Sequence, residues 1–508
     1  MSEHYPVIDL FAGAGGLGEG FTSFTSAGEK RPFRTALAIE KDPAAHSTLL
    51  LRSFFKKFSP GDIPDAYWAY AKSEISRDQL FELYPKQAEK AIDETKCIEL
   101  GEATHAQVQK LIEKQLGNSA KWVLVGGPPC QAYSIVGRSR MRNKIPDFEK
   151  DVRHFLYQEY LKILADHMPP VFVMENVKGL LSATVSGELI IEKILKDLQN
   201  PGFASRKRHN GLGYRLFSLA EGKSPATLEP EDFLVETEKY GIPQARHRIL
   251  ILGIRNDIDI TPETLTPCVA PSVAQIIGDL PKIRSTISKE EDSFTRWKSI
   301  LMSTQKEAWY LKGKGNGLLP TITTLDEALD MLEGIDELSP GAEASKHRGK
   351  PARYSRWFRA DCDGIIMNHS ARSHMSSDLH RYLFASSYAA TNSKSPQLCD
   401  FPKSLLPAHK NVQDGIFSDR FRVQLGDKPS TTITSHISKD GHYFIHYDPS
   451  QCRSLTVREA ARLQTFPDNF KFEGTRTAQY RQVGNAVPPL LSAKIAEIVY
   501  DILRRIRL

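Results

Sequence analysis

Long apolar runs are missing from this chain of 508 residues. No stretch approaches the roughly 20 consecutive apolar residues that a membrane-spanning helix needs. The N-terminus enters a strand pattern by Val7, with no basic segment followed by an apolar run of signal-peptide length. The sequence therefore predicts a cytoplasmic chain that makes no contact with a membrane.

Cysteine is also scarce, with 6 residues in the whole chain. Five of them are far apart in sequence, form no CxxC pair and have no histidine cluster nearby: Cys97, Cys268, Cys362, Cys399 and Cys452. This spacing argues against a disulfide framework and against a zinc site. We expect these five to be structural residues in a reducing compartment, and we expect no bound metal.

The composition that remains is typical of a soluble globular protein, with 40% apolar residues and a length that favours two or three domains. The net charge of +6 is modest, but basic residues gather in two places. One cluster contains Arg138, Arg140, Arg142 and Lys144, and the other spans residues 206–209. These clusters indicate a polyanionic partner, and solvated charged loops are the alternative.

A glycine-rich turn follows the first predicted strand. The apolar residues 7–11 run into a segment whose glycines, in residues 13–18, match GxGxxG. Glycines allow a tight strand-to-helix turn and a close approach of the backbone to a ligand. The next strand, residues 36–39, ends in Glu40, which is suitably placed for ribose hydroxyl groups. This pattern alone fits a nicotinamide-dependent dehydrogenase equally well, and a buried turn without a ligand is a third alternative.

The sixth cysteine stands on a stiff loop. Cys130 follows the apolar residues 122–125 and two prolines, Pro128 and Pro129. Each proline fixes its own φ and restricts the residue before it, so the backbone has little freedom at the thiol. The sequence therefore predicts that Cys130 is a nucleophile, although a lone cysteine is more often a small buried apolar residue.

Two further motifs place charged side chains near strand ends. Glu175 follows the predicted buried strand 171–174, where its carboxyl group could donate a proton; a structural carboxylate that caps a loop is the alternative. Arg246 and Arg248 alternate before another strand and so share one face. Arginine holds a carboxylate or phosphate in a fixed fork, although surface arginines are common at strand starts.

Strand and helix patterns alternate along the first half of the chain. This alternation predicts an α/β fold with a doubly wound sheet, in which ligands gather at the carboxyl ends of the strands. The predicted strands are 7–11, 36–39, 96–100, 122–125, 171–174, 214–219 and 249–254, and the predicted helices are 106–116 and 155–167. Gly13, Glu40, Cys130 and Glu175 each follow a strand, so we expect them to face one crevice.

Taken in order, these motifs resemble the DNA cytosine-C5 methyltransferase family, and the resemblance covers both ends of the chain. The matching segments are DLFAGAGGLGEGF from Asp9, AIEKD with Glu40, GGPPCQAYS from Gly126, MENVKG from Met174, QARHR from Gln244, LTVREAARLQTFPD from Leu455 and YRQVGNAVPP from Tyr480. The resemblance implies a doubly wound mixed sheet of the S-adenosylmethionine-dependent methyltransferase type, with a smaller inserted target-recognition domain.

By this resemblance, the enzyme transfers a methyl group from S-adenosylmethionine to C5 of a flipped cytosine in a specific duplex sequence. Cys130 would attack cytosine C6, while Glu175 would engage N3 and the exocyclic amine. Arg248 would contact the base and Glu175, and Arg246 would support the thiol loop and a nearby phosphate. The implied cofactor-binding residues are Asp9, Phe11, Gly13, Gly15, Gly16, Leu17, Glu40, Glu102, Pro128, Leu156, Asn485 and Val487.

The resemblance also divides the chain. Residues 1–257 would form the first part of the catalytic domain, residues 258–430 the target-recognition domain, and residues 431–508 the return to the catalytic domain. The insert mixes Ser, Lys, Gly and Pro with aromatic and basic residues and lacks a clear alternation of strands and helices. Such a region could read base edges in the major groove.

Two features depart from the family pattern. Residues 53–95 form a longer segment than the minimal fold needs. The usual Gly-Asp-Ile for the adenine of the cofactor is also displaced. Residues 61–63 match it in letters, but Glu102, just past the predicted strand 96–100, fits the order of the sheet better.

The resemblance implies double-stranded DNA as the partner and a monomeric enzyme. It also implies a setting in prokaryotic restriction-modification or related phage defence, with a cognate restriction endonuclease or another defence protein. Two alternatives come from the same superfamily: a tRNA cytosine-C5 methyltransferase and a catalytically silent DNA-binding relative. The insert is unlike the compact recognition region of the tRNA enzymes, and a silent relative would be expected to lose Cys130 or Glu175. A dehydrogenase would have no use for the PPCQ sequence.

Overall fold

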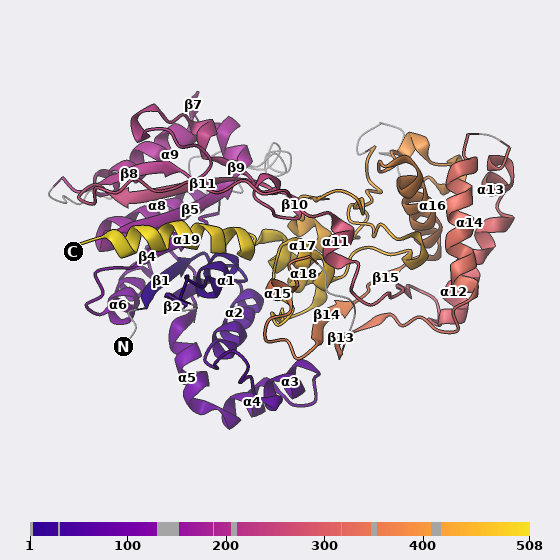
Figure 1. Cartoon of the computed structure of the whole chain (residues 1–508), viewed down its shortest axis with the longest axis horizontal. Coiled ribbons are helices and arrows are strands. Elements are labelled where there is room, and N and C mark those ends of the chain that lie inside the picture. Colours follow the sequence, from indigo (N-terminus) through magenta and orange to yellow (C-terminus); the bar gives the residue numbers. More distant parts are fainter. Residues whose placement is uncertain are drawn as a thin grey trace.

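One mixed sheet organises the first half of the chain (Figure 1). The structure is a computed structural model that describes residues 4–28, 31–129, 152–185, 187–204, 211–315, 317–346, 353–407 and 418–507. The strand order is β3-β2-β1-β4-β5-β11-β8, with β9 paired to β11. The strands are β1 (Tyr5–Leu10), β2 (Phe33–Glu40), β3 (Thr95–Cys97), β4 (Val123–Gly126), β5 (Val171–Val177), β8 (Tyr214–Ser218), β9 (Leu234–Glu236) and β11 (His247–Arg255).

The pairing of these strands confirms the predicted mixed α/β sheet. Strands β1 to β5 of this sheet are parallel, whereas β11 runs antiparallel to β5, β8 and β9. Predicted strand boundaries differ from the observed ones by up to three residues, and two of these differences bear on the site. Strand β3 ends at Cys97, before residue 100. Strand β5 continues through Glu175 because residues 175–177 pair with the start of β11, so Glu175 lies within the strand and not after it.

Helices cover both faces of the sheet, because its strands are rich in β-branched residues that are buried on either side. Helices α6, α8 and α9 pack on one face, and α1 and α19 pack on the other. These helices are α1 (Gly16–Ser23), α6 (His105–Leu116), α8 (Val152–His167), α9 (Ile190–Gln199) and α19 (Pro489–Arg505). Among the described residues, no helix is both long enough and apolar enough to cross a membrane.

The last part of the chain returns to the sheet through α17 (Val457–Leu463), α18 (Arg476–Asn485) and α19. Thr456 and Glu459 form a reciprocal capping box that begins α17. Helix α19 starts at Pro489, and its apolar side chains pack beside α1 (Figure 1). The first and last described helices of the chain therefore share one face of the sheet.

The region between the sheet and α17 is more regular than the sequence indicated. It contains α11 (Val273–Ile277), α12 (Phe294–Ser303), α13 (Ala308–Gly313), α14 (Leu319–Glu333), α15 (Ser355–Phe358), α16 (Ser376–Asn392) and the hairpin of β13 (Gly341–Lys346) and β14 (Ile365–Ser370). The sequence shows no clear alternation of strands and helices here, and the structure of this region is mainly helical, since α12, α13, α14 and α16 bury one apolar core. That core also includes Ile445 and Cys452, which lie beyond residue 430. The division of the chain at residues 258 and 430 stays a prediction. We call residues 258–430 the recognition region.

The long early segment folds into helices that lie below the sheet in Figure 1. Helix α2 (Pro43–Phe55) is followed by α3 (Asp65–Ala71), α4 (Arg77–Leu83) and α5 (Pro85–Glu94). Asp42 caps α2 through the backbone N–H groups of Ala44 and Ala45. Their apolar side chains form a cluster of their own, which includes residues of β14.

Candidate active site

The glycine turn between β1 and α1 is built from backbone conformations that few residues adopt. Phe11 and Gly13 have φ of 57°, and Gly15 has φ of 85°. A Cβ atom on Gly16 would lie 2.2 Å from the carbonyl oxygen of Val487. The turn therefore needs glycine at Gly15 for the left-handed conformation and at Gly16 for the close approach of the segment before α19.

Glu40 closes this turn from the end of β2. One carboxylate oxygen accepts the backbone N–H of Gly13 at 2.8 Å. The other accepts the N–H groups of Lys41 and Asp42 at 2.9 and 2.8 Å. Three backbone donors thus fix the carboxylate at the carboxyl end of the sheet, next to the glycine turn, where it was expected.

Asp9 and Leu17 lie beneath the turn and not on its open side. Asp9 is 1% exposed, and its carboxylate accepts the N–H of Gly18 at 3.2 Å. Burial raises the pKa of Asp9 to about 7, and nearby Glu40 adds to the rise. The Leu17 side chain packs against α19, and its carbonyl accepts the Ser492 hydroxyl. The two side chains therefore support the turn from below, and the role of Asp9 and Leu17 in cofactor binding stays a prediction.

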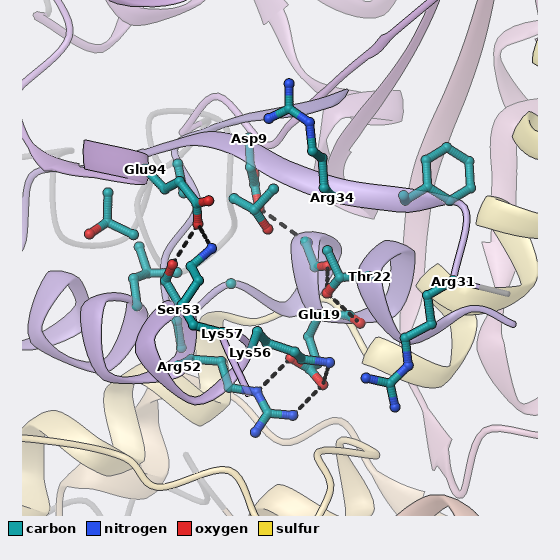
Figure 2. A pocket seen from close by; sticks show the side chains of 18 of the residues that line it. Asp9, Glu19, Thr22, Arg31, Arg34, Arg52, Ser53, Lys56, Lys57 and Glu94 are labelled. Carbon is teal, nitrogen blue, oxygen red and sulfur yellow. Dashed lines mark hydrogen bonds and ion pairs between the residues drawn. The ribbon is translucent and has the colours of Figure 1, made fainter. Parts of the chain in front are cut away.

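Asp9 also lines a cavity of about 260 Å³ between α1, α2 and β2. Figure 2 shows Glu19 at its floor, paired with Arg52 and Lys56, and Glu94 paired with Lys57. This cavity extends toward Arg31 and Arg34 near the amino end of β2 and contains neither Glu175 nor Arg248. This cavity is therefore separate from the predicted catalytic residues that the structure describes, since none of them lines it.

Glu175 and Arg248 meet across the β5–β11 pair. The Arg248 Nε atom lies 2.9 Å from Glu175 Oε1, and each side chain is 14% exposed. Burial lowers the pKa of Arg248, and the neighbouring Glu175 carboxylate opposes that shift. The predicted contact between these two side chains is present, and it leaves part of the carboxyl group facing outward.

The loop that leads to Cys130 starts directly beside Glu175. A Cβ atom on Gly127 would lie 2.9 Å from Glu175 Oε2, so a larger residue here would displace the Glu175 carboxylate. The Asn176 amide donates to the carbonyl of Pro128 at 3.4 Å, and its oxygen accepts the N–H of Val177. The sequence analysis did not select Asn176, although it stands in the same MENVKG segment. This amide ties the PPC sequence to β5.

Arg246 occupies a different environment from its neighbour. It is 1% exposed, and one guanidinium nitrogen donates to the carbonyls of Ile433 and Gly484 at 2.8 and 3.3 Å. Burial lowers the pKa of Arg246, with a further contribution from Arg248. The predicted phosphate contact is therefore corrected, because the side chain is enclosed and joins three distant parts of the chain.

The other predicted cofactor residues lie around the same edge of the sheet. Pro128 is buried at the end of β4, Leu156 is buried in α8, and Val487 is buried between α18 and α19. Asn485 is exposed at the end of α18. Glu102 is exposed in the turn before α6, whereas Gly61 donates to Asp361 far from the glycine turn. The assignment of Glu102 to the adenine end of the cofactor stays a prediction.

Several predicted features lie outside the described residues. They are Cys130, the basic residues Arg138, Arg140, Arg142 and Lys144, and the basic cluster at residues 206–209. Within the described part of the chain, no group of histidine, cysteine or carboxylate side chains could hold a metal ion. The five other cysteines are free thiols.

Comparison with known proteins identifies a family and a fold. The family model for C-5 cytosine-specific DNA methylase matches residues 70–500. The type II methyltransferase M.Bpa9945I of Bacillus paralicheniformis is 33% identical over 98% of this chain and 99% of its own length. The type II methyltransferase M.AgeI of Thalassovita gelatinovora is 27% identical over 97% of this chain and 98% of its own.

A solved structure has the same fold. It is described as a DNA modification methyltransferase encoded within a prophage (E. coli), with a TM-score of 0.54 and 17% sequence identity. The alignment covers 99% of this chain and 100% of that one. The fold is therefore shared along the whole length of both chains.

Proposed function

Because the chain belongs to the C-5 cytosine-specific DNA methylase family and is a DNA (cytosine-5)-methyltransferase, we propose that it methylates one flipped cytosine through a covalent Cys130 adduct. The observation that carries this proposal is the Glu175–Arg248 pair beside the start of the PPC loop. It supplies a carboxyl group and a cation next to the segment that presents the thiol.

The turn and its surroundings fit S-adenosylmethionine as the cofactor. Glu40 retains acceptor capacity toward a ribose hydroxyl at Oε2, which accepts one N–H group, whereas Oε1 already accepts two. The first turn of α1 presents the Gly16 and Leu17 N–H groups, which suit a carboxylate. Phe11 and Val487 add apolar surface near the turn. When bound, the cofactor supplies an electrophilic methyl group on a sulfonium centre.

The residue types fit methylation at a carbon that is a poor nucleophile. A Cys130 thiolate would form a bond to cytosine C6, while Glu175 gives a proton to N3 and takes up the charge that develops on the ring. C5 then becomes nucleophilic and accepts the methyl group. Loss of the C5 proton to water and breakage of the S–C6 bond return the thiolate, and N3 returns its proton to Glu175.

The cytosine must leave the helix before this chemistry can occur, because C6 is inaccessible inside a stacked duplex. We propose that the recognition region reads neighbouring base pairs while the flipped base meets Glu175. Since the relatives M.Bpa9945I and M.AgeI are called type II methyltransferases, we also propose a restriction-modification setting with a partner endonuclease. A monomer acting in the cytoplasm completes this proposal.

Replacement of the thiol tests the mechanism. We expect Cys130→Ala to abolish transfer of radiolabelled methyl groups from S-adenosylmethionine to DNA, while the affinity for the cofactor changes less than threefold. The unmutated enzyme should form an irreversible adduct with DNA that carries 5-fluorocytosine at the target, because fluorine cannot leave as the C5 proton does. Cys399→Ala, at another free thiol, is the matched control.

Bisulfite sequencing of DNA from cells that express the chain identifies the target sequence and the methylated cytosine. Transfer to tRNA and not to DNA would establish the alternative substrate. Turnover by Cys130→Ala, or no adduct at a site that the enzyme methylates, would exclude the covalent route. Absence of any transfer by the unmutated chain would identify a silent relative.

A further inference from the structure

Residues 56–94 lie outside the proposed active site, but they contact both the catalytic sheet and the recognition region. Helix α5 leads directly into β3 at the edge of the sheet, since it ends at Glu94 and the strand begins at Thr95. At the other side, α3 packs toward the β13–β14 hairpin. The segment therefore contacts two parts of the enzyme, the edge of the sheet and the β13–β14 hairpin (Figure 1).

The apolar part of this contact is fully buried. Tyr67 of α3 is 1% exposed and stacks edge-on against Phe55 of α2, with ring centroids 5.0 Å apart. Ile365 and Met367 of β14 are both 0% exposed and belong to the same cluster. These two side chains pack with the helical segment although they start from the recognition region. Buried contacts of this kind resist sliding because the interior is densely packed.

Two hydrogen bonds also join the α3 region to the neighbouring parts of the chain. The Gly61 N–H donates to the Asp361 carboxylate at 2.9 Å, and this pair joins the loop before α3 to the loop before β14. The Tyr70 hydroxyl donates to Glu473 at 2.7 Å, which joins α3 to the segment that enters α18. The two hydrogen bonds therefore connect α3 and the loop before it to the loop before β14 and to the segment before α18.

Strand β14 also forms hydrogen bonds with α17 and with the segment that follows α17. Arg458 of α17 donates from Nε to the carbonyl of Met367 at 2.7 Å, and the Asn368 amide donates to the carbonyl of Phe472 at 3.2 Å. Asn368 has φ of 58°, so the strand carries a local kink at this point. The hairpin thus lies between α17 and the helical segment.

We propose that residues 56–94 are a brace that sets the position of the recognition region relative to the catalytic edge, and that Ile365 and Asp361 are its positioning residues. The inference rests on the proposed function and concerns how the enzyme selects its target. Each correct base pair adds discrimination through its groove contacts. That discrimination controls base flipping only if the reading surface and the catalytic edge keep a fixed spacing. A loosened brace lets cytosine reach Glu175 before all base contacts form.

The test measures discrimination between sites, which a purely structural role would not alter selectively. The substrates are a duplex with the site found by bisulfite sequencing of the unmutated enzyme and a duplex with one altered pair. In Ile365→Ala combined with Asp361→Ala, we expect the ratio of kcat/KM for the two duplexes to fall at least tenfold. KM for DNA should rise severalfold, while kcat on the correct site and cofactor affinity change less than threefold.

Ile322→Ala is the matched control. Ile322 is 1% exposed in the core of α14, away from the brace, so its truncation removes a comparable buried side chain. We expect its discrimination ratio to stay within twofold of the unmutated enzyme. A ratio that is retained in the double variant, or that falls equally in the control, overturns the proposal.

Asp361→Ala alone covers the case in which the double variant does not fold. Hydrogen exchange should then increase at residues 341–346 and 365–370, and discrimination should fall at least threefold. Increased exchange with unchanged discrimination overturns the brace. If the unmutated enzyme methylates no DNA, the proposed function fails, whereas an active enzyme with brace-independent selectivity rejects only this inference.

Discussion

Glu40 and Glu175 lie in two halves of the carboxyl-end edge of the sheet, and the protein holds these two carboxylates by different means. In the half formed by β1 and β2, Glu40 is fixed by three backbone N–H groups, and the turn beside it consists of backbone in unusual conformations. In the half formed by β5 and β11, Glu175 is held by the side chain of Arg248. Backbone donors cannot rotate away, whereas an arginine side chain can exchange partners.

This difference fits two different tasks. A binding site for a cofactor needs acceptors that stay in one position, because preorganised groups lose little freedom when a ligand arrives. A proton donor needs a partner that tolerates both of its protonation states. Arg248 can turn toward a substrate oxygen when the carboxyl group becomes neutral, since the pair is partly exposed. Three predictions test whether the halves are separable in this way.

The largest effect is expected from Glu175→Gln. The amide cannot give a proton to N3, so the rate of methyl transfer in a single turnover should fall by about 10²- to 10⁴-fold. Cofactor affinity should stay within twofold, because Glu175 belongs to the other half of the edge. Glu192→Gln on α9 provides the control. A loss of cofactor affinity as large as the loss of rate would show that the halves are not independent.

The next effect concerns Asp9, which supports the cofactor half from below. Its pKa rises from 3.8 to about 7 in the folded chain, so the unfolded chain loses this proton first as pH increases. The free energy of unfolding should therefore fall by about 1.4 kcal/mol per pH unit between roughly pH 4 and pH 7. Asp9→Asn retains an acceptor for the Gly18 N–H and cannot titrate.

We expect this variant to be more stable than the unmutated chain by about 4 kcal/mol at pH 8 and by little near pH 4. Urea unfolding across that pH range measures the difference. Asp259→Asn is the control, because the Asp259 side chain is fully exposed. Parallel pH profiles for the unmutated chain and Asp9→Asn would contradict the assignment of this loss to Asp9.

The smallest effect compares two glycines of the same turn. In Gly16→Ala, the new methyl group would meet the Val487 carbonyl at 2.2 Å, so the free energy of unfolding should fall by about 3 kcal/mol. In Gly13→Ala, nothing lies within 4 Å, and only the positive φ opposes the change, by about 1 kcal/mol. Thermal unfolding of both variants gives the order. Equal losses of unfolding free energy in the two variants would mean that the turn shifts to relieve the contact with Val487, contrary to this prediction.

The sheet could be predicted because its signals are local. Residues 171–174 and 249–254 are apolar runs of strand length, and the glycine turn follows an apolar strand. The extension of β5 through Glu175 could not be predicted in this way, because it depends on pairing with the start of β11. Register between distant strands is a property of the folded sheet.

The surroundings of Arg246 and the helices of the recognition region were missed for different reasons. The two carbonyls that bind Arg246 belong to Ile433 and Gly484, and no local pattern in the sequence joins these positions. Helix α14, by contrast, carries Ile322, Leu325, Leu329 and Leu332 at helical spacing. The surrounding Ser, Lys and Gly residues obscured that signal. The glycine turn and the Glu175–Arg248 contact were the parts of the site that the motifs specified well.

The packing of α1 against α19 has a consequence for synthesis. A ribosome adds about 5 to 20 residues per second, so the apolar side of α1, with Leu17 and Phe21, emerges roughly half a minute or more before α19 does. During that time the nascent chain exposes a surface that its own last helix covers. This face of the sheet can therefore be completed only after α19 has been made.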